Sequence, residues 1–195
     1  MDKGREIVVV AHSCGSLPGI AICQGQSLQG RAKNGKIGGI RSIILVAAGA
    51  VTKRGFGSLG SFHHAMQTGS DAWPPYLEPR ADGLAHSTSA ARSAFYSDIA
   101  DEEAVRLMAD LKPTSTAALT EPMNQYAGED LTIPSFYVIC SGDLAIPPDF
   151  QRFVCDQIPG MKGKVFESGH SPYLSIPDQF VGFVNECVHA IDGPA

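Results

Sequence analysis

Four short apolar runs constrain the fold of this 195-residue sequence more than any other feature. Their apolar residues are continuous rather than alternating, which is typical of strands covered on both faces. A sheet of this kind is parallel and carries helices on its two sides. The runs cover residues 6–11, 42–47, 135–140 and 164–167.

Two helices are indicated after the later strands, each with proline in its first turn, where a missing N–H is tolerated. After Pro147-Pro148, apolar residues at helical spacing are Phe150, Phe153, Val154 and Ile158. After Pro177, one helical face would carry Phe180, Val181, Val184 and Val188. The alternation predicts an α/β fold with a mainly parallel sheet of about four strands and flanking helices.

The segment 51–130 differs from the rest, because it is rich in Gly, Pro and Ser and contains one clear helix, 101–111. Acidic residues crowd the first turn of that helix, where the helix dipole favours negative charge. Eighty residues are too many for a simple connection between strands. We therefore predict one domain, 1–195, with 51–130 inserted as a helical lid.

The composition excludes several classes of protein. Fifteen Lys and Arg against twenty Asp and Glu leave a net charge of -5, with no basic run for nucleic acid. The apolar run near the N-terminus, Ile7–Ala11, is too short for a membrane span or a signal sequence. Five scattered cysteines form no CxxC pair. We expect no metal, no cofactor, no membrane partner and a cytoplasmic location.

The junction of the first strand with the following helix holds the most reactive arrangement. Its residues are Val10-Ala11-His12-Ser13-Cys14-Gly15. This matches a nucleophile elbow, in which small residues flank a serine lifted above the sheet edge. The N–H of Cys14 would then face a developing oxyanion. A serine at this place can also be a plain helix cap, so the motif alone leaves both readings open.

Two more strands end in residues that complete this chemistry. Asp143 follows the strand 135–140, and His170 follows the strand 164–167. Ser13, Asp143 and His170 thus occur in the order nucleophile, acid, base, all at one sheet edge. Individually, Asp143 could form a turn and His170 could be an ordinary loop histidine. Their coincidence favours a catalytic triad.

Four stretches of the chain resemble the α/β-hydrolase superfamily, in the branch with fungal esterase-like members, plant methylesterases and hydroxynitrile lyases. They are VVVAHSCGSLPG, AFYSDIADEEAVRLMADLKP, VICSGDLAIPPDFQ and ESGHSPYLSIPDQF. The resemblance implies that Ser13 is the nucleophile, His170 the general base and acid, and Asp143 its orienting partner.

The chain departs from that family before Ser13. Family members place four strands ahead of the nucleophile strand, and a loop after the third supplies a second oxyanion donor. Here only one strand precedes Ser13. The first strand would then be an open apolar edge, which predicts self-association through it. The lyases also carry a lysine soon after the histidine, whereas Ser171-Pro172 follows His170 here. This favours hydrolysis.

The sequence therefore predicts a serine hydrolase that cleaves an ester, lactone or thioester of a small apolar molecule through an acyl-enzyme. The alternatives are a truncated or non-catalytic relative that acts as a binding or interaction protein, and a lyase or cyclisation enzyme of a natural-product pathway. The side chains of His12 and Cys14 are expected to pack. The segment 73–76 could line an apolar substrate pocket or brace the lid, and bracing is the favoured reading.

Overall fold

A four-stranded parallel sheet forms the centre of this computed structural model, which describes residues 1–190. Within this sheet, every pair of neighbouring strands is parallel, so the predicted α/β fold is confirmed. The sheet order is β1-β2-β6-β7. The strands are β1 (Glu6–His12), β2 (Gly39–Val46), β6 (Ser135–Cys140) and β7 (Lys162–Phe166).

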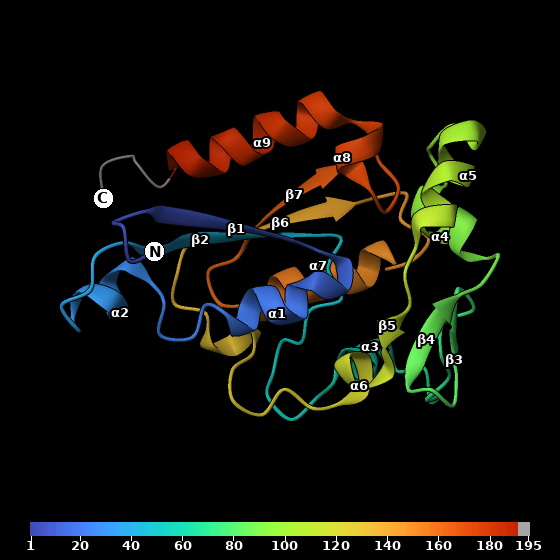
Figure 1. Ribbon diagram of the computed structural model, residues 1–195, viewed down its shortest axis with the longest axis horizontal. Coiled ribbons are helices and arrows are strands. Elements are labelled where there is room, and N and C mark those ends of the chain that lie inside the picture. Colours follow the sequence, from blue (N-terminus) through green and yellow to red (C-terminus); the bar gives the residue numbers. More distant parts are fainter. Residues whose placement is uncertain (191–195) are drawn as a thin grey trace.

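Helices cover both faces of the sheet (Figure 1). One face carries α1 (Ser16–Ala21) and α7 (Pro148–Gln157), and the other carries α9 (Pro177–Ala190). Alternate residues of β2 enter two separate cores, with Ile43 on the α1 and α7 side and Ile44 on the α9 side. A short helix missed by the sequence reading, α2 (Leu28–Ala32), packs on β2.

Helix α1 lies very close to the first strand. A Cβ at Gly19 would lie 2.7 Å from the Cβ of Ala11, closer than two non-bonded carbon atoms approach in proteins. The small residues at both positions therefore let the helix approach the strand, and this fixes the turn between them.

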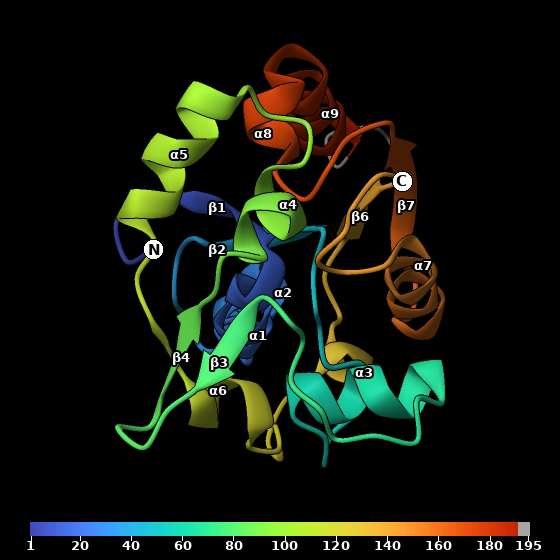
Figure 2. The same ribbon diagram turned by 90° about the vertical axis from the view of Figure 1, so that its right-hand side faces the viewer.

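The lid region lies at the carboxyl end of the parallel strands (Figures 1 and 2). The expected helix is present as α5, but the region holds more structure than one helix. A second, antiparallel sheet has the order β3-β4-β5. The elements are α3 (Ser58–Met66), β3 (Leu77–Pro79), β4 (Leu84–Ser87), α4 (Ala91–Tyr96), α5 (Asp101–Asp110), β5 (Thr114–Ser115), α6 (Thr116–Thr120) and the 3-10 helix η2 (Gly128–Asp130).

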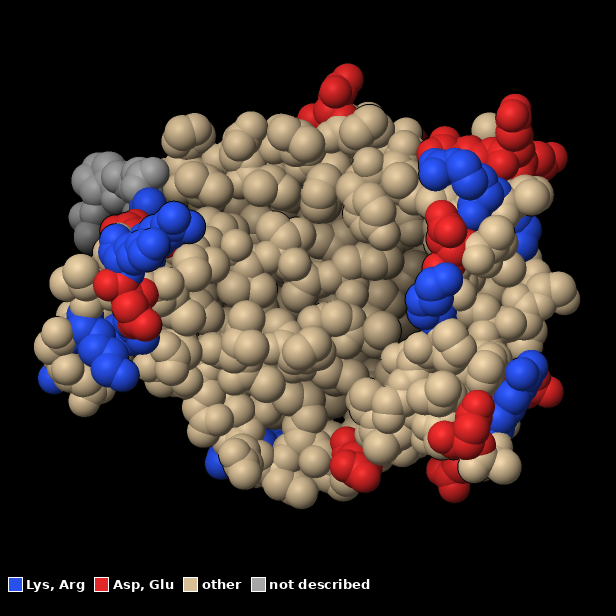
Figure 3. Space-filling model, viewed as in Figure 1, with Lys and Arg blue, Asp and Glu red and all other residues tan. Residues whose placement is uncertain are grey.

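The two outer strands are not buried as predicted. Val10 in β1 is 47% exposed, and in β7 only Phe166 is buried. The edge β7 carries Lys162 and Lys164, which discourage pairing with a further strand. By contrast, the face along the β1 edge shows a broad area without charged side chains (Figure 3). The expected self-association through this edge stays a prediction.

Helix α9 contacts the sheet through a face slightly different from the predicted one. Phe183 and Cys187 are buried in the core, with Phe180 and Val184 partly buried beside them. Val181 is 55% exposed, so its assignment to the buried face was wrong. Residues 180, 183, 184 and 187 follow the helical period more closely.

Candidate active site

Ser13 lies in the sharp turn that links β1 to α1. The turn is the 3-10 helix η1 (Ser13–Gly15), and α1 begins directly after it. Ser13 has a φ of 51°, a left-handed conformation that is uncommon for residues with a side chain. A residue held in this way at the end of a strand has the backbone of a nucleophile elbow.

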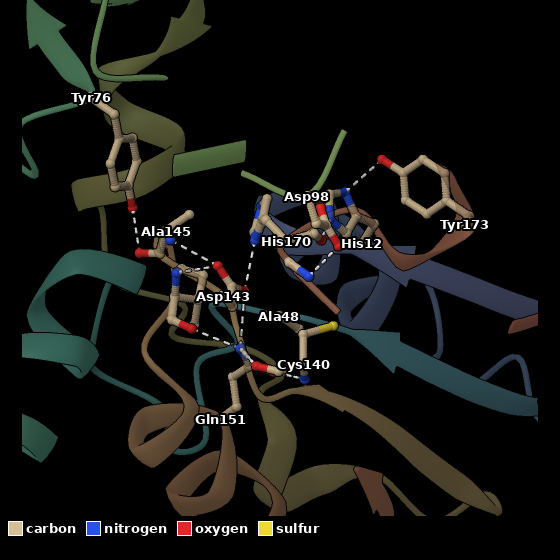
Figure 4. Close-up of polar contacts among 12 residues, drawn as sticks. His12, Ala48, Tyr76, Asp98, Cys140, Asp143, Ala145, Gln151, His170 and Tyr173 are labelled. Atoms are coloured by element: carbon tan, nitrogen blue, oxygen red, sulfur yellow. Dashed lines mark hydrogen bonds and ion pairs between the residues drawn. The ribbon is translucent and has the colours of Figure 1, made fainter. Parts of the chain in front are cut away.

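Asp143 and His170 are brought into contact from the ends of β6 and β7. His170 Nδ1 lies 2.8 Å from Asp143 Oδ2, and both side chains are almost fully buried (Figure 4). Nδ1–H donates this hydrogen bond to the carboxylate, which leaves Nε2 of the ring without a proton. This is the tautomer that a general base requires.

Asp143 is held by four hydrogen bonds. Its Oδ1 accepts from the N–H groups of Ala145 and Ile146, at 2.7 and 3.0 Å. Its Oδ2 accepts from Gln151 Nε2 at 2.9 Å as well as from His170. These four bonds use both carboxylate oxygens and hold the carboxylate in one orientation.

Gln151 is a positioning residue that the sequence reading missed. It is fully buried on α7, and its Oε1 accepts from Cys140 N at 2.9 Å. Its Nε2 also donates to Ile146 O at 2.7 Å. One side chain therefore links the end of β6 to the Asp143 turn. The available signal was an amide on the apolar face of α7, beside Phe150 and Val154.

Ser13 and His170 line one cavity of about 310 Å³. No hydrogen bond joins their side chains anywhere in residues 1–190. Bonds of this kind are often long before substrate binds and tighten in the complex. The structure thus places Ser13 and His170 in the lining of one cavity, with Asp143 in contact with His170.

Residues of the segment 51–130 supply much of the cavity wall, which is mainly apolar. Among the residues that the structure describes, Lys112 is the only Lys, Arg, Asp or Glu in its lining, and it is exposed. The volume falls within the ordinary range for small-molecule sites. Apolar and aromatic lining comes from Leu59, Pro74, Tyr76, Leu77, Phe95, Tyr96, Leu111, Leu119, Ile146 and Tyr173.

The segment 73–76 both braces the lid and lines the cavity. Trp73 packs in an apolar cluster below the lid, as expected. Tyr76 lines the cavity, and its hydroxyl donates to Ala145 O at 2.9 Å (Figure 4). Because Ala145 also donates to Asp143, Tyr76 connects the lid to the turn that carries the acid.

His12 also lines the cavity instead of packing beneath the turn. Its ring centroid is 4.6 Å from that of His170, and its Nε2 lies 2.8 Å from His170 O. Burial, followed by the nearby His170, lowers the pKa of His12 to about 4. A neutral His12 donates from Nε2 to the carbonyl, and Tyr173 O–H can donate to its Nδ1 at 3.4 Å.

The low pKa of His12 makes stability depend on pH. An unfolded chain protonates His12 near pH 6.5, while the folded chain does so near pH 4. The free energy of unfolding should therefore fall as the pH decreases from 6.5 to 4. In urea unfolding at pH 7 and pH 5, we expect His12→Asn to lose less stability than the wild type. Equal losses would contradict the assignment.

Cys14 was expected to pack, but its side chain is exposed and lines the cavity. Its backbone N–H belongs to η1, the turn that follows Ser13. An oxyanion beside Ser13 would accept from this backbone N–H and not from the thiol, so the thiol itself is not required for the chemistry.

We therefore expect Cys14→Ala to keep a kcat close to the wild-type value. Iodoacetamide should inactivate the wild type by filling the cavity, and should leave Cys14→Ala active. The other cysteines are buried or half-buried, so alkylation in native conditions should occur mainly at Cys14. Inactivation of both proteins at equal rates would refute this reading.

Within residues 1–190, no group of three or more His, Cys, Asp or Glu could hold a metal ion. No helix in the same range is long and apolar enough to cross a bilayer. Each of the three lid histidines makes a side-chain contact with a nearby residue of the lid. These histidines are His63, His64 and His86.

Comparisons with known proteins match nearly the whole chain. A protein of Phoma sp. named as a probable hydrolase is 25% identical over 192 residues, which cover 95% of this chain and 71% of the relative. The pyrethroid hydrolase of Sphingobium faniae has a TM-score of 0.63 at 17% identity, covering 96% of this chain and 71% of that one.

Two esterases have the same fold. Polyneuridine aldehyde esterase has a TM-score of 0.64 at 12% identity, covering 95% of this chain and 73% of its own. A methylesterase from Arabidopsis has a TM-score of 0.62 at 19% identity, with 97% and 72% covered. The model of the "Alpha/beta hydrolase family" matches residues 2–183. The chain therefore belongs to the alpha/beta hydrolase family.

Proposed function

We propose that this protein is a serine hydrolase that cleaves a carboxylic ester, lactone or thioester of a small apolar molecule. The observation that carries the proposal is the buried Asp143–His170 pair, whose histidine lines the same cavity as a serine in a left-handed strand-to-helix turn. Membership of the hydrolase family supports the reaction class.

In the first half of the reaction, His170 Nε2 takes the proton of Ser13 Oγ as this oxygen attacks the acyl carbon. The carbonyl oxygen becomes an oxyanion that accepts from Cys14 N–H. Asp143 keeps the resulting imidazolium oriented and stabilises its charge. When the intermediate collapses, the leaving alcohol or thiol takes the proton from His170, and an ester to Ser13 remains.

In the second half, water replaces the leaving group. His170 removes a proton from the water, which attacks the acyl carbon of the Ser13 ester. The second oxyanion collapses, Ser13 recovers its proton from His170, and the carboxylic acid leaves. Every proton and acyl transfer in this scheme is supplied by the three side chains and water.

The apolar lining of the cavity supports the substrate class. A substrate that placed a charged group against this apolar wall, away from Lys112, would lose its hydration with no opposite charge to pair with. An uncharged aromatic or aliphatic ester would instead contact Phe95, Tyr96 and the other apolar residues of the wall. Lys112 at the rim can face the carboxylate product as it leaves.

The test is labelling of the purified protein with a fluorophosphonate, followed by mass spectrometry of the modified peptide. Such probes react with a serine that is activated by its base. We expect a single adduct on Ser13, and hydrolysis of uncharged p-nitrophenyl esters by the same preparation. A folded protein with neither labelling nor turnover would sink the proposal and favour a non-catalytic, binding relative. Labelling without hydrolysis would favour lyase or cyclisation chemistry.

A further inference from the structure

The turn between α4 and α5 in the lid contacts the loop that carries His170. Asp98 Oδ2 accepts a hydrogen bond from Gly169 N at 2.5 Å. Gly169 is buried, so its N–H has no access to water and depends on this partner. A Cβ on Gly169 would lie 2.5 Å from Asp98 Oδ1, which shows how closely the carboxylate is fitted to this glycine.

The same lid segment covers the imidazole ring of His170. The ring centroids of Phe95 and His170 are 5.4 Å apart, with 30° between their planes. Tyr76 contacts Phe95 edge-on, with 5.1 Å between their ring centroids. The lid therefore contacts His170 twice, at the ring through Phe95 and at the preceding amide through Asp98.

Arg92 holds the turn that presents Asp98. Its guanidinium donates to Tyr96 O and to Ile99 O, the latter at 3.3 Å. It also pairs with Asp101 Oδ1 at 2.5 Å. These contacts bracket Asp98 on both sides in the sequence, so the carboxylate is presented by a turn with little freedom.

The other side of His170 is held by the nucleophile strand. His12 Nε2 donates to His170 O, while Asp98 accepts from Gly169 N. The backbone around the base is thus fixed from the lid on one side and from the end of β1 on the other (Figure 4). Loss of either contact frees the loop after β7.

We propose that Asp98 is a positioning residue that couples the docked lid to the catalytic base. By holding Gly169 N, it sets the direction in which His170 leaves the loop, and thus the place of Nε2 relative to Ser13. In this arrangement, His170 reaches its catalytic orientation when the lid docks. This inference rests on the proposed hydrolase function.

The test compares Asp98→Ala, which removes the acceptor, with Asp98→Asn, which keeps an oxygen for Gly169 N. Asp110→Ala is the matched control, because Asp110 is an exposed carboxylate at the far end of α5. We expect Asp98→Ala to lower kcat and the rate of fluorophosphonate labelling by up to about 100-fold, the cost of a 1 Å misplacement. Asp98→Asn should recover most of both rates, and Asp110→Ala should change neither.

Asp98 does not line the cavity, so KM should change little in comparison with kcat. The Gly169 amide should exchange with solvent faster in Asp98→Ala, and the NMR signal of the His170 Nδ1 proton should shift or broaden. Unchanged kcat together with faster Gly169 exchange would overturn the proposal, as would equal losses in Asp98→Ala and Asp110→Ala.

Failure of the proposed function is distinguishable from failure of this inference. If the wild type shows neither labelling nor turnover, the hydrolase proposal fails by itself. The two NMR measurements still decide whether Asp98 orients His170. An unchanged His170 signal in Asp98→Ala would refute the positioning role even in that case.

Discussion

Replacement of Ser13 by alanine is expected to lower kcat for ester hydrolysis by about 10⁶-fold, the cost of losing a serine nucleophile that acts with its base as one unit. The variant keeps His170, Asp143 and the Cys14 N–H, so residual activity should be close to what the cavity and the oxyanion donor provide. Initial rates with an uncharged p-nitrophenyl ester measure this directly.

The matched control is Ser16→Ala. Ser16 begins α1 three residues later, and its buried hydroxyl has no hydrogen-bond partner among the described residues. Its loss should leave kcat near the wild-type value. Because Ser13 has a positive φ, the Ser13→Ala protein should also be checked by circular dichroism. A folded Ser13→Ala protein with wild-type activity would exclude Ser13 as the nucleophile.

The second large effect is expected at Asp143. Asp143→Asn should lower kcat by about 10⁴-fold, because an amide facing His170 Nδ1 stabilises the tautomer with its proton on Nε2. That tautomer cannot take the proton of Ser13. The neutral amide also leaves the imidazolium without its counter-charge. Steady-state kinetics across pH 5 to 9 should show the loss at every pH.

Asp149→Asn controls for removal of a carboxylate from the same region. Asp149 is exposed in the first turn of α7, and its change should leave kcat unaltered. Asp143→Asn should remain folded, because the amide oxygen can still accept from Ala145 N and Ile146 N. Loss of less than tenfold in kcat would argue that another residue orients His170.

The sheet was predictable because its strands are nearly pure apolar runs. Ser135–Cys140 is buried along its whole length, and its bounds agree with the prediction. The positions of Asp143 and His170 followed from the rule that parallel strands end at one edge. Their mutual contact required the actual turn geometry, which no spacing in the sequence encodes.

The lid was harder to predict because its strands are only two to four residues long. Such segments show no measurable periodicity, so a single helix was all that the pattern indicated. The contact of Asp98 with Gly169 N joins residues 71 positions apart. Contacts of this kind arise from tertiary packing, and Gln151 was missed for the same reason.

The position of β1 at the sheet edge has a consequence for heat inactivation. Ser13 directly follows a strand, β1, that pairs with one neighbour in the sheet, β2, while Asp143 follows an inner strand. Edge elements open locally at lower free energy than the centre of a domain. Activity should accordingly be lost on heating before the central strands unfold. It should return on cooling, when β1 pairs with β2 again. Midpoints from activity and from far-ultraviolet dichroism would then separate, the first lying lower.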